Sequence, residues 1–106
     1  MFDILDINIY RNLCNDSNIA ITQHAQKRFL ERNICLDDIK NVIITGIIIK
    51  EYPTDQPLPS CLVLGKTTNN QPAHIVISTD CEFIYVITAY HPDPKIWNDN
   101  FTKRKE

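Results

Sequence analysis

The sequence has no long apolar run, no internal repeat and no low-complexity segment. Its longest apolar stretch, Val42 to Ile49, is interrupted by Thr45 and Gly46, so it falls far short of the ~20 residues that a membrane-spanning helix needs. The N-terminus, Met1 to Ile4, lacks the basic and apolar regions of a secretory signal. These absences argue against a membrane-associated protein and lead us to expect a cytoplasmic one.

Closely spaced cysteine pairs are absent as well. The cysteines, Cys14, Cys35, Cys61 and Cys81, are widely separated, and no Cys-x-x-Cys pair occurs among them. A zinc knuckle needs two such pairs for tetrahedral geometry, so this kind of metal site is not expected. In a reducing cytosol we expect four free, mostly buried thiols. A cysteine nucleophile needs a basic, half-exposed setting, which we would look for only at Cys35.

An excess of basic charge is also lacking, because 11 Lys and Arg residues face 13 Asp and Glu residues, for a net charge of −2. The total argues against a generally basic nucleic-acid binder. The basic residues are nevertheless clustered, with Lys27, Arg28 and Arg32 close together and Lys103-Arg104-Lys105 in the tail. A local basic face on an acidic protein can bind a phosphate chain. The alternative is a solvated helix face and a frayed tail over about 102–106.

The first part of the chain has the apolar spacing of helices. With 106 residues the chain should form a single domain over 1–106. Three helices are predicted, at Ile4 to Cys14, from the N-cap Thr22 to about Arg32, and from Leu36 to Thr45. Asn33 can adopt the left-handed backbone conformation that often follows a helix, here the second one, and Gly46 can end the third helix.

After Gly46 the apolar period changes to that of strands. The segments bounded by turn residues are Ile47–Tyr52, Cys61–Lys66, Ala73–Ser78 and Phe83–Tyr90. Turns this short imply antiparallel neighbours. The sequence therefore predicts an α+β fold, in which two to three N-terminal helices pack on one face of a four-stranded antiparallel sheet.

Two motifs combine polar groups with aromatic or proline residues that would hold them in place. They are Thr22 to Arg32 (TQHAQKRFLER) and Thr88 to Trp97 (TAYHPDPKIW). Together they resemble the domain-of-unknown-function family 4258, a group of small prokaryotic proteins that looks related to RelE-type toxin ribonucleases. The resemblance covers Ile4 to Lys103. It implies a RelE/barnase-like arrangement of helices and sheet, a toxin-like activity, and a cognate antitoxin, often a small zinc-finger or helix-turn-helix protein.

The helix that begins after Thr22 offers one candidate site. His24 and Arg28 are four residues apart and so lie on one helix face, and His24 falls in the first turn, where free backbone N–H groups favour an anion. Arg28 and these donors could hold a phosphate while His24 exchanges a proton. The alternative is that His24 packs at the edge of the core and Arg28 pairs with Glu31 or a loop carboxylate.

Two further residues, Arg32 and His74, are candidates for the same site. Arg32 falls on the apolar side of its helix, where it must either form an ion pair, with Asp93 or Asp55, or line a phosphate site. His74 shares a strand face with Val76 and Ser78 rather than with the core-facing Ala73, Ile75 and Ile77, so we expect it to be open to solvent or ligand.

The end of the last predicted strand completes the candidate set. Tyr90 and His91 end this strand, where side chains can project into a cleft, and we expect Trp97 to pack structurally on the body of the protein. The resembling family usually has a basic residue, often arginine, at the position of His91, so this position departs from the pattern. A histidine there could bind phosphate or act as acid or base. We expect His24, Arg28 and Tyr90 to converge on one concave surface, with His74 or His91 nearby.

The function we expect from these residues is metal-independent cleavage of RNA. His24 or His74 would be the base, Arg28 and Arg32 the charge stabilisers, and Tyr90 or His91 the acid or orienting group. The expected partners are RNA, free or ribosome-bound, and the cognate antitoxin, and no cofactor is expected. A zinc site from the three histidines, which no close spacing supports, is the less favoured arrangement.

The alternative function is a non-catalytic protein-binding module that keeps the same fold. Such a module would use a sheet edge or a helix face to bind its partner. The net acidic charge and the histidine at position 91 favour it.

Overall fold

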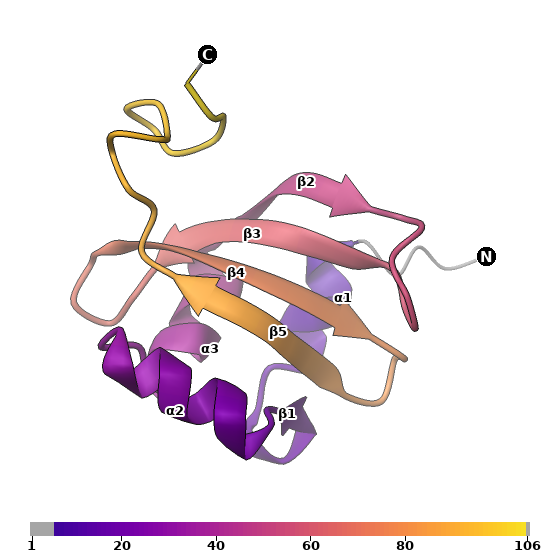
Figure 1. Cartoon of the computed structure of the whole chain (residues 1–106). Coiled ribbons are helices and arrows are strands. Elements are labelled where there is room, and N and C mark those ends of the chain that lie inside the picture. The colour runs from indigo at the N-terminus through magenta and orange to yellow at the C-terminus, as the bar shows by residue number, and fades with distance from the viewer. Residues whose placement is uncertain (1–5, 106) are drawn as a thin grey trace.

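The computed structural model of this chain describes residues 6–105. In this part of the chain the elements follow one another as α1 (Ile7–Asn12), the 3₁₀-helix η1 (Asp16–Asn18), β1 (Ile19–Ala20), α2 (Gln23–Glu31), α3 (Leu36–Thr45), β2 (Ile47–Tyr52), β3 (Ser60–Lys66), β4 (Pro72–Thr79) and β5 (Ile84–Tyr90). The strands form one sheet in the order β1-β5-β4-β3-β2, and the three α-helices pack on one side of it (Figure 1). No helix of residues 6–105 has the length and apolar character required to cross a membrane.

The helix boundaries follow local capping chemistry. Thr22 caps α2 as predicted, because its hydroxyl accepts from the backbone N–H of Ala25 at 3.1 Å. Asn33 adopts a left-handed φ of 61° beyond the end of this helix. The first helix is shorter than predicted. It begins after Asp6, whose carboxylate accepts from a backbone N–H of the first turn, and the predicted start at Ile4 lies outside the described residues.

The predicted α+β fold is confirmed, with one correction to the sheet. Strands β2 to β5 form the expected antiparallel meander, with bounds within one residue of the prediction. A fifth strand, β1, was missed, and it pairs in parallel with the start of β5 through Ile19 and Ile84. With only two residues, β1 is too short to show a period in the sequence, and it exists because the edge of β5 is there to pair with it.

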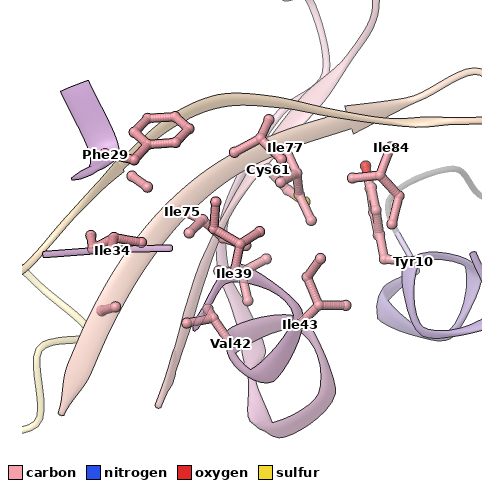
Figure 2. Close-up of a cluster of buried hydrophobic side chains, with 14 residues drawn as sticks. Tyr10, Phe29, Ile34, Ile39, Val42, Ile43, Cys61, Ile75, Ile77 and Ile84 are labelled. Carbon is pink, nitrogen blue, oxygen red and sulfur yellow. The ribbon is translucent and has the colours of Figure 1, made fainter. Parts of the chain in front are cut away.

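Aliphatic side chains fill the space between the helices and the sheet. Figure 2 shows Ile39, Val42 and Ile43 of α3 beneath Ile75 and Ile77 of β4, and all five are buried. Two glycines let α3 approach the strands. A Cβ atom on Gly65 would lie 2.8 Å from Cα of Val42, and one on Gly46 would lie 2.6 Å from Cγ1 of Val63. Gly46 is therefore required for close packing rather than for a left-handed turn, since its φ is −88°.

A buried carboxylate ties α3 to the β3–β4 turn. Asp38 accepts from the backbone N–H of Cys35 at 3.0 Å, and from the backbone N–H and hydroxyl of Thr68 at 3.0 and 2.8 Å. Burial by itself raises the pKa of this carboxyl, but these hydrogen bonds outweigh it and bring the pKa of Asp38 down to about 2. The carboxylate thus remains charged in the folded protein across most of the acidic range.

The C-terminal segment covers one end of the other side of the sheet. Figure 1 shows it on the face opposite the helices. Residues 96–105, here called the C-terminal hairpin, are held by an antiparallel bridge between Trp97 and Arg104 and by a 2.7 Å bond from the Lys105 N–H to the Ile96 carbonyl. In residues 96–105 the backbone thus folds back and hydrogen-bonds to itself, and the fraying expected of the tail stays a prediction.

Candidate functional site

The face of the sheet opposite the helices, here called the open face, carries an unusual set of polar and aromatic side chains. In the strand register, His74 of β4 lies between Leu64 of β3 and Tyr90 of β5. The C-terminal hairpin brings Trp97 and Phe101 over this row of residues. A candidate site thus forms where the end of β5 meets the hairpin.

His74 is buried, with none of its surface exposed, so the prediction that it faces solvent was wrong. It does lie on the face opposite the aliphatic core, as its alternation with Ile75 indicated. The error arose because the C-terminal hairpin covers that face. The ring of Trp97 packs edge-on against the imidazole, with centroids 4.4 Å apart, and this also confirms the structural packing expected of Trp97.

The hydrogen bonds of His74 define its tautomer. Nε2 lies 2.8 Å from the carbonyl oxygen of Phe101, which can only accept, so Nε2 carries the proton. Nδ1 then accepts from the Tyr90 hydroxyl at 3.2 Å. Burial lowers the pKa of His74, although the Phe101 carbonyl opposes this, so the imidazole is neutral near pH 7. The result is a neutral base with its lone pair directed at a phenol.

Tyr90 connects this buried histidine to a surface pocket. Its side chain is half-buried, and burial raises the pKa of its hydroxyl, with Tyr52 adding to the increase and Arg104 opposing it. The phenol is therefore un-ionised at neutral pH. Tyr90 lines the pocket on one side and hydrogen-bonds His74 on the other. It can therefore donate its proton to His74 as it accepts a proton from a ligand in the pocket.

The pocket itself has a volume of about 510 Å³ and is basic and aromatic. It lies between the C-terminal hairpin and strands β2, β3 and β5, and its walls are Ile49, Lys50, Tyr52, Leu62, Tyr90, Trp97, Thr102, Lys103 and Arg104. Three of these residues are cations, and no acidic residue is among them. We call this the basic pocket.

Two of the cations are held against aromatic rings. Lys50 Nζ lies 5.5 Å from the centre of the Tyr52 ring, and the guanidinium carbon of Arg104 lies 5.8 Å from that of Trp97. Cation–π contacts of this kind are weak at exposed sites, but they restrict where the charges stand. The basic pocket therefore presents charge and flat apolar surface together, a combination suited to a nucleotide.

Arg32 does not reach the basic pocket. Its Nη1 donates to the carbonyl of Ala89 at 2.8 Å, near the end of β5, and the side chain is half-buried. The predicted partners Asp55 and Asp93 are not used. Among residues 6–105 the ion pairs join Lys40 to Asp16 and Asp37, and Arg32 is not part of them. A backbone carbonyl thus accepts one hydrogen bond from Arg32, the arginine that the helical pattern places on the apolar side of α2.

His24 and Arg28 are exposed on α2, on the helix side of the sheet. This helix starts next to β1, which pairs with the beginning of β5, whereas Arg32 just beyond its end reaches Ala89 near the end of β5. His24 therefore lies near the start of β5, whereas Tyr90 ends this strand. The two residues also lie on opposite faces of the sheet. The predicted convergence of His24 and Arg28 with Tyr90 was wrong, because α2 packs on the helix side of the sheet and Tyr90 lies on the other face.

His91 also stands outside the basic pocket. It is exposed, and its Nδ1 lies 3.1 Å from the carbonyl oxygen of Pro72, so this nitrogen carries the proton. Of the predicted site residues, the structure brings together only His74 and Tyr90. The roles predicted for His24, Arg28, Arg32 and His91 stay predictions, and they would have to be exercised separately from this pair.

The cysteines are free thiols, but fewer are buried than expected. Cys61 is buried, Cys14 and Cys81 are half-buried, and Cys35 is exposed. The Cys35 thiol lies 3.2 Å from a carboxylate oxygen of Asp38, so its setting is acidic rather than basic. Within residues 6–105, no three His, Cys, Asp or Glu side chains come together as a set that could hold a metal ion.

Sequence reasoning missed half of the basic pocket. The sequence pattern predicts Lys50 and Tyr52 only as strand residues, although they lie two apart and pair with Leu62 and Ser60 on the same face. Their alternation with Glu51, just before Pro53, is the signal that could have found them. Lys103 and Arg104 were recognised as a basic cluster, but only the hairpin shows that they stand beside Tyr90.

Comparison with known proteins identifies a family without a described activity. Residues 21–91 match the family model described as Domain of unknown function (DUF4258), and the chain belongs to this family. The match spans α2 through β5 and includes both His74 and Tyr90. No curated protein and no solved structure matches the chain.

Proposed function

We propose that this member of the DUF4258 family is a metal-independent endoribonuclease of the toxin type, with its active site in the basic pocket. The observation that supports this most directly is the hydrogen bond between the Tyr90 hydroxyl and the neutral, buried His74. This pair is a proton acceptor that opens onto a pocket lined by three cations. RNA cleavage needs both of these features.

Proton transfer would run from the ribose to the histidine. As the 2′-oxygen forms its bond to phosphorus, its proton moves to the Tyr90 oxygen, and the Tyr90 proton moves to Nδ1 of His74. The bond from phosphorus to the 5′-oxygen breaks, and that oxygen takes a proton from water. The hydroxide that remains recovers a proton from the imidazolium through Tyr90, which restores the neutral His74. The products are a 2′,3′-cyclic phosphate and a free 5′-hydroxyl. The Phe101 carbonyl stabilises the imidazolium that forms, because it accepts from Nε2 throughout.

Charge and base binding come from the rest of the pocket. Lys50, Lys103 and Arg104 would stabilise the negative charge that develops on the phosphorane oxygens. Tyr52 and Trp97 offer rings on which unpaired bases can stack. Because a base inside a duplex cannot reach such a surface, the expected substrate is single-stranded RNA, free or ribosome-bound.

A cleavage assay tests this proposal. Purified protein is incubated with a fluorescent single-stranded RNA in EDTA, and the products are identified by mass spectrometry. Tyr90→Phe should lower the rate by about 100-fold or more, as expected when one preorganised group at the reacting atoms is lost. Tyr85→Phe is the matched control on the same strand, since its hydroxyl bonds Asp80 outside the basic pocket, and it should cleave at the wild-type rate.

Expression in a bacterial host tests the toxin assignment. Induction of the protein should arrest growth, and the Tyr90→Phe variant should not. Co-expression of the neighbouring gene should relieve the arrest if that gene encodes the antitoxin. An intact RNA pool together with normal growth would contradict the proposal.

A second candidate function is a non-catalytic protein-binding module. Two large apolar side chains favour it, because Ile44 at the end of α3 and Ile47 at the start of the edge strand β2 are 56% and 55% exposed. Exposed apolar residues beside a free strand edge can add a partner strand. Normal growth on expression, with no RNA cleavage, would favour this function instead.

A further inference from the structure

The open face carries a second pocket, which is acidic rather than basic. It has a volume of about 710 Å³ and lies where β4 ends and β5 begins, away from the C-terminal hairpin. Its walls are Asp55, Gln56, Pro57, Leu58, Ser78, Asp80, Tyr85 and Ile87, mainly apolar surface with two carboxylates and no cation. We call it the acidic pocket. Its charge would repel RNA phosphates, so its occupant differs from that of the basic pocket.

A β-bulge supplies the exposed apolar group of this pocket. The register of β4 and β5 shifts between Val76 and Ile77, so that Ile87 has no partner across the strand. Ile87 is 51% exposed in the middle of a strand. Bulges often re-aim a side chain for a purpose, and a large apolar group held in this way is a candidate contact.

The carboxylates beside Ile87 are held in place. Asp80 accepts from the Tyr85 hydroxyl at 2.6 Å and from the backbone N–H groups of Glu82 and Phe83 at 2.9 Å. These bonds keep the pKa of Asp80 at about 2, so it stays charged. Asp55 accepts from the Ser60 hydroxyl at 2.6 Å and is exposed. The acidic pocket therefore suits an apolar side chain flanked by cations.

The C-terminal hairpin of the same chain presents such a side chain. Ile96 is 48% exposed. Lys95 precedes it, and Lys105 lies across the hairpin from it, since the Lys105 N–H donates to the Ile96 carbonyl. Both lysines are exposed. An isoleucine between two lysines is thus the complement, in charge and in polarity, of the acidic pocket.

We propose that the chain forms a two-fold dimer in which Ile96 of each copy enters the acidic pocket of the other. Figure 1 shows the hairpin beyond the end of β5 and the β2–β3 loop, which contributes Asp55 to the acidic pocket, at the opposite end of the sheet. When two such faces meet in antiparallel orientation, each hairpin lies over the other copy's pocket. The contact is therefore reciprocal and closes at two copies.

Sedimentation equilibrium and light scattering on the purified chain test the dimer. The wild type should change from monomer to dimer as its concentration rises, and high salt should weaken the association because opposite charges take part. Ile87→Asp and Ile96→Asp should each raise the dissociation constant at least about tenfold. Both residues are exposed, and circular dichroism will verify that the variants fold.

A charge exchange tests the pairing itself. Lys95→Glu alone and Asp55→Lys alone should each be monomeric, because both place like charges in both contacts. An equimolar mixture of the two variants should form a heterodimer, since both of its contacts then join opposite charges. A wild-type chain that is monomeric at all concentrations, variants that dimerise like wild type, or a mixture that fails to associate would each overturn the proposal. Assembly beyond two copies would overturn the two-fold arrangement.

Discussion

The two faces of the sheet are built from different kinds of residue, although they share the same strands. Toward the helices, Ile75 and Ile77 of β4 join a core of aliphatic side chains. On the open face, the same strand places His74 and Ser78 next to aromatic, charged and bulged residues. The helix face is a continuous apolar layer, whereas the open face holds two pockets of opposite charge.

This difference separates stability from function within a single sheet. Aliphatic packing is tolerant of exact side-chain identity and contributes most of the stability. Hydrogen-bonded groups such as His74 contribute less to stability, but they fix atoms in defined positions and protonation states. Changes on the helix face should therefore affect folding, and changes on the open face should affect binding and chemistry. Four experiments probe this division.

The largest expected effect is on the helix face. Ile75→Ala removes a fully buried side chain and should lower the free energy of unfolding by about 4 kcal/mol. Val76 is the next residue of β4, and it is half-buried on the open face. Val76→Ala should lower the free energy of unfolding by only about 1 kcal/mol. Urea unfolding followed by circular dichroism measures both. Equal losses would show that the two faces do not differ as proposed.

The second test concerns the histidine that the open face buries. His74→Phe should retain much of the ring contact with Trp97, but it leaves the Phe101 carbonyl without its 2.8 Å donor. The expected loss of stability is about 2 kcal/mol, the cost of an unpaired buried polar group. RNA cleavage should fall about 100-fold, like that of Tyr90→Phe. His91→Phe, at an exposed site, is the control and should change neither measurement.

The free energy of unfolding should change with pH in two separate windows. The folded pKa of His74 is lowered from its ordinary 6.5, so the unfolded chain binds more protons and stability falls as the pH drops through about 6.5. The folded pKa of Asp38 is about 2 against 3.8, so its contribution of ~2 kcal/mol is present above pH 3.8 and lost as the pH falls toward 2.

Two variants assign these windows. His74→Phe should flatten the upper window only. Asp38→Asn should reduce the lower window without abolishing it, because Asp80, whose pKa is also held at about 2, contributes to the same window. Urea unfolding measured between pH 2 and 8 gives the change of the free energy of unfolding with pH in both windows. An upper window that survives His74→Phe would show that another group is responsible for it.

The smallest expected effect concerns RNA affinity. Lys50→Ala removes one cation from the basic pocket and should weaken binding of a single-stranded RNA by about fivefold. The slope of log affinity against log salt concentration should become shallower by somewhat less than one. Lys27→Ala on α2, on the helix side of the sheet, should leave affinity unchanged. Fluorescence anisotropy at several salt concentrations measures the RNA affinity of both variants. An equal loss in both variants would indicate diffuse electrostatic attraction rather than a pocket.

The elements of the fold were largely predictable because their signals are local. The helix from Leu36 to Thr45 matched its prediction at both ends, since its apolar stripe and flanking Gly46 lie within one short segment. The four long strands were found from alternation and turn residues alone. The strand at Ile19–Ala20 was missed, because the residue that pairs with Ile19, Ile84, is 65 positions away in the sequence.

The candidate site was only partly predictable, for the same reason. The sequence by itself indicated that His74 lies on the face opposite Ile75 and Ile77, because side chains alternate along a strand. Tyr90 lies on the same face as His74 because the bulge at Ile87 shifts the alternation of β5, and no local signal predicted that bulge. Tertiary structure alone decided that His74 is buried and neutral, and that Lys103 and Arg104 stand beside Tyr90. Burial and pocket charge depend on how the hairpin folds back over the sheet. Periodicity in the sequence reports the face of a residue, and it carries no information about what covers that face.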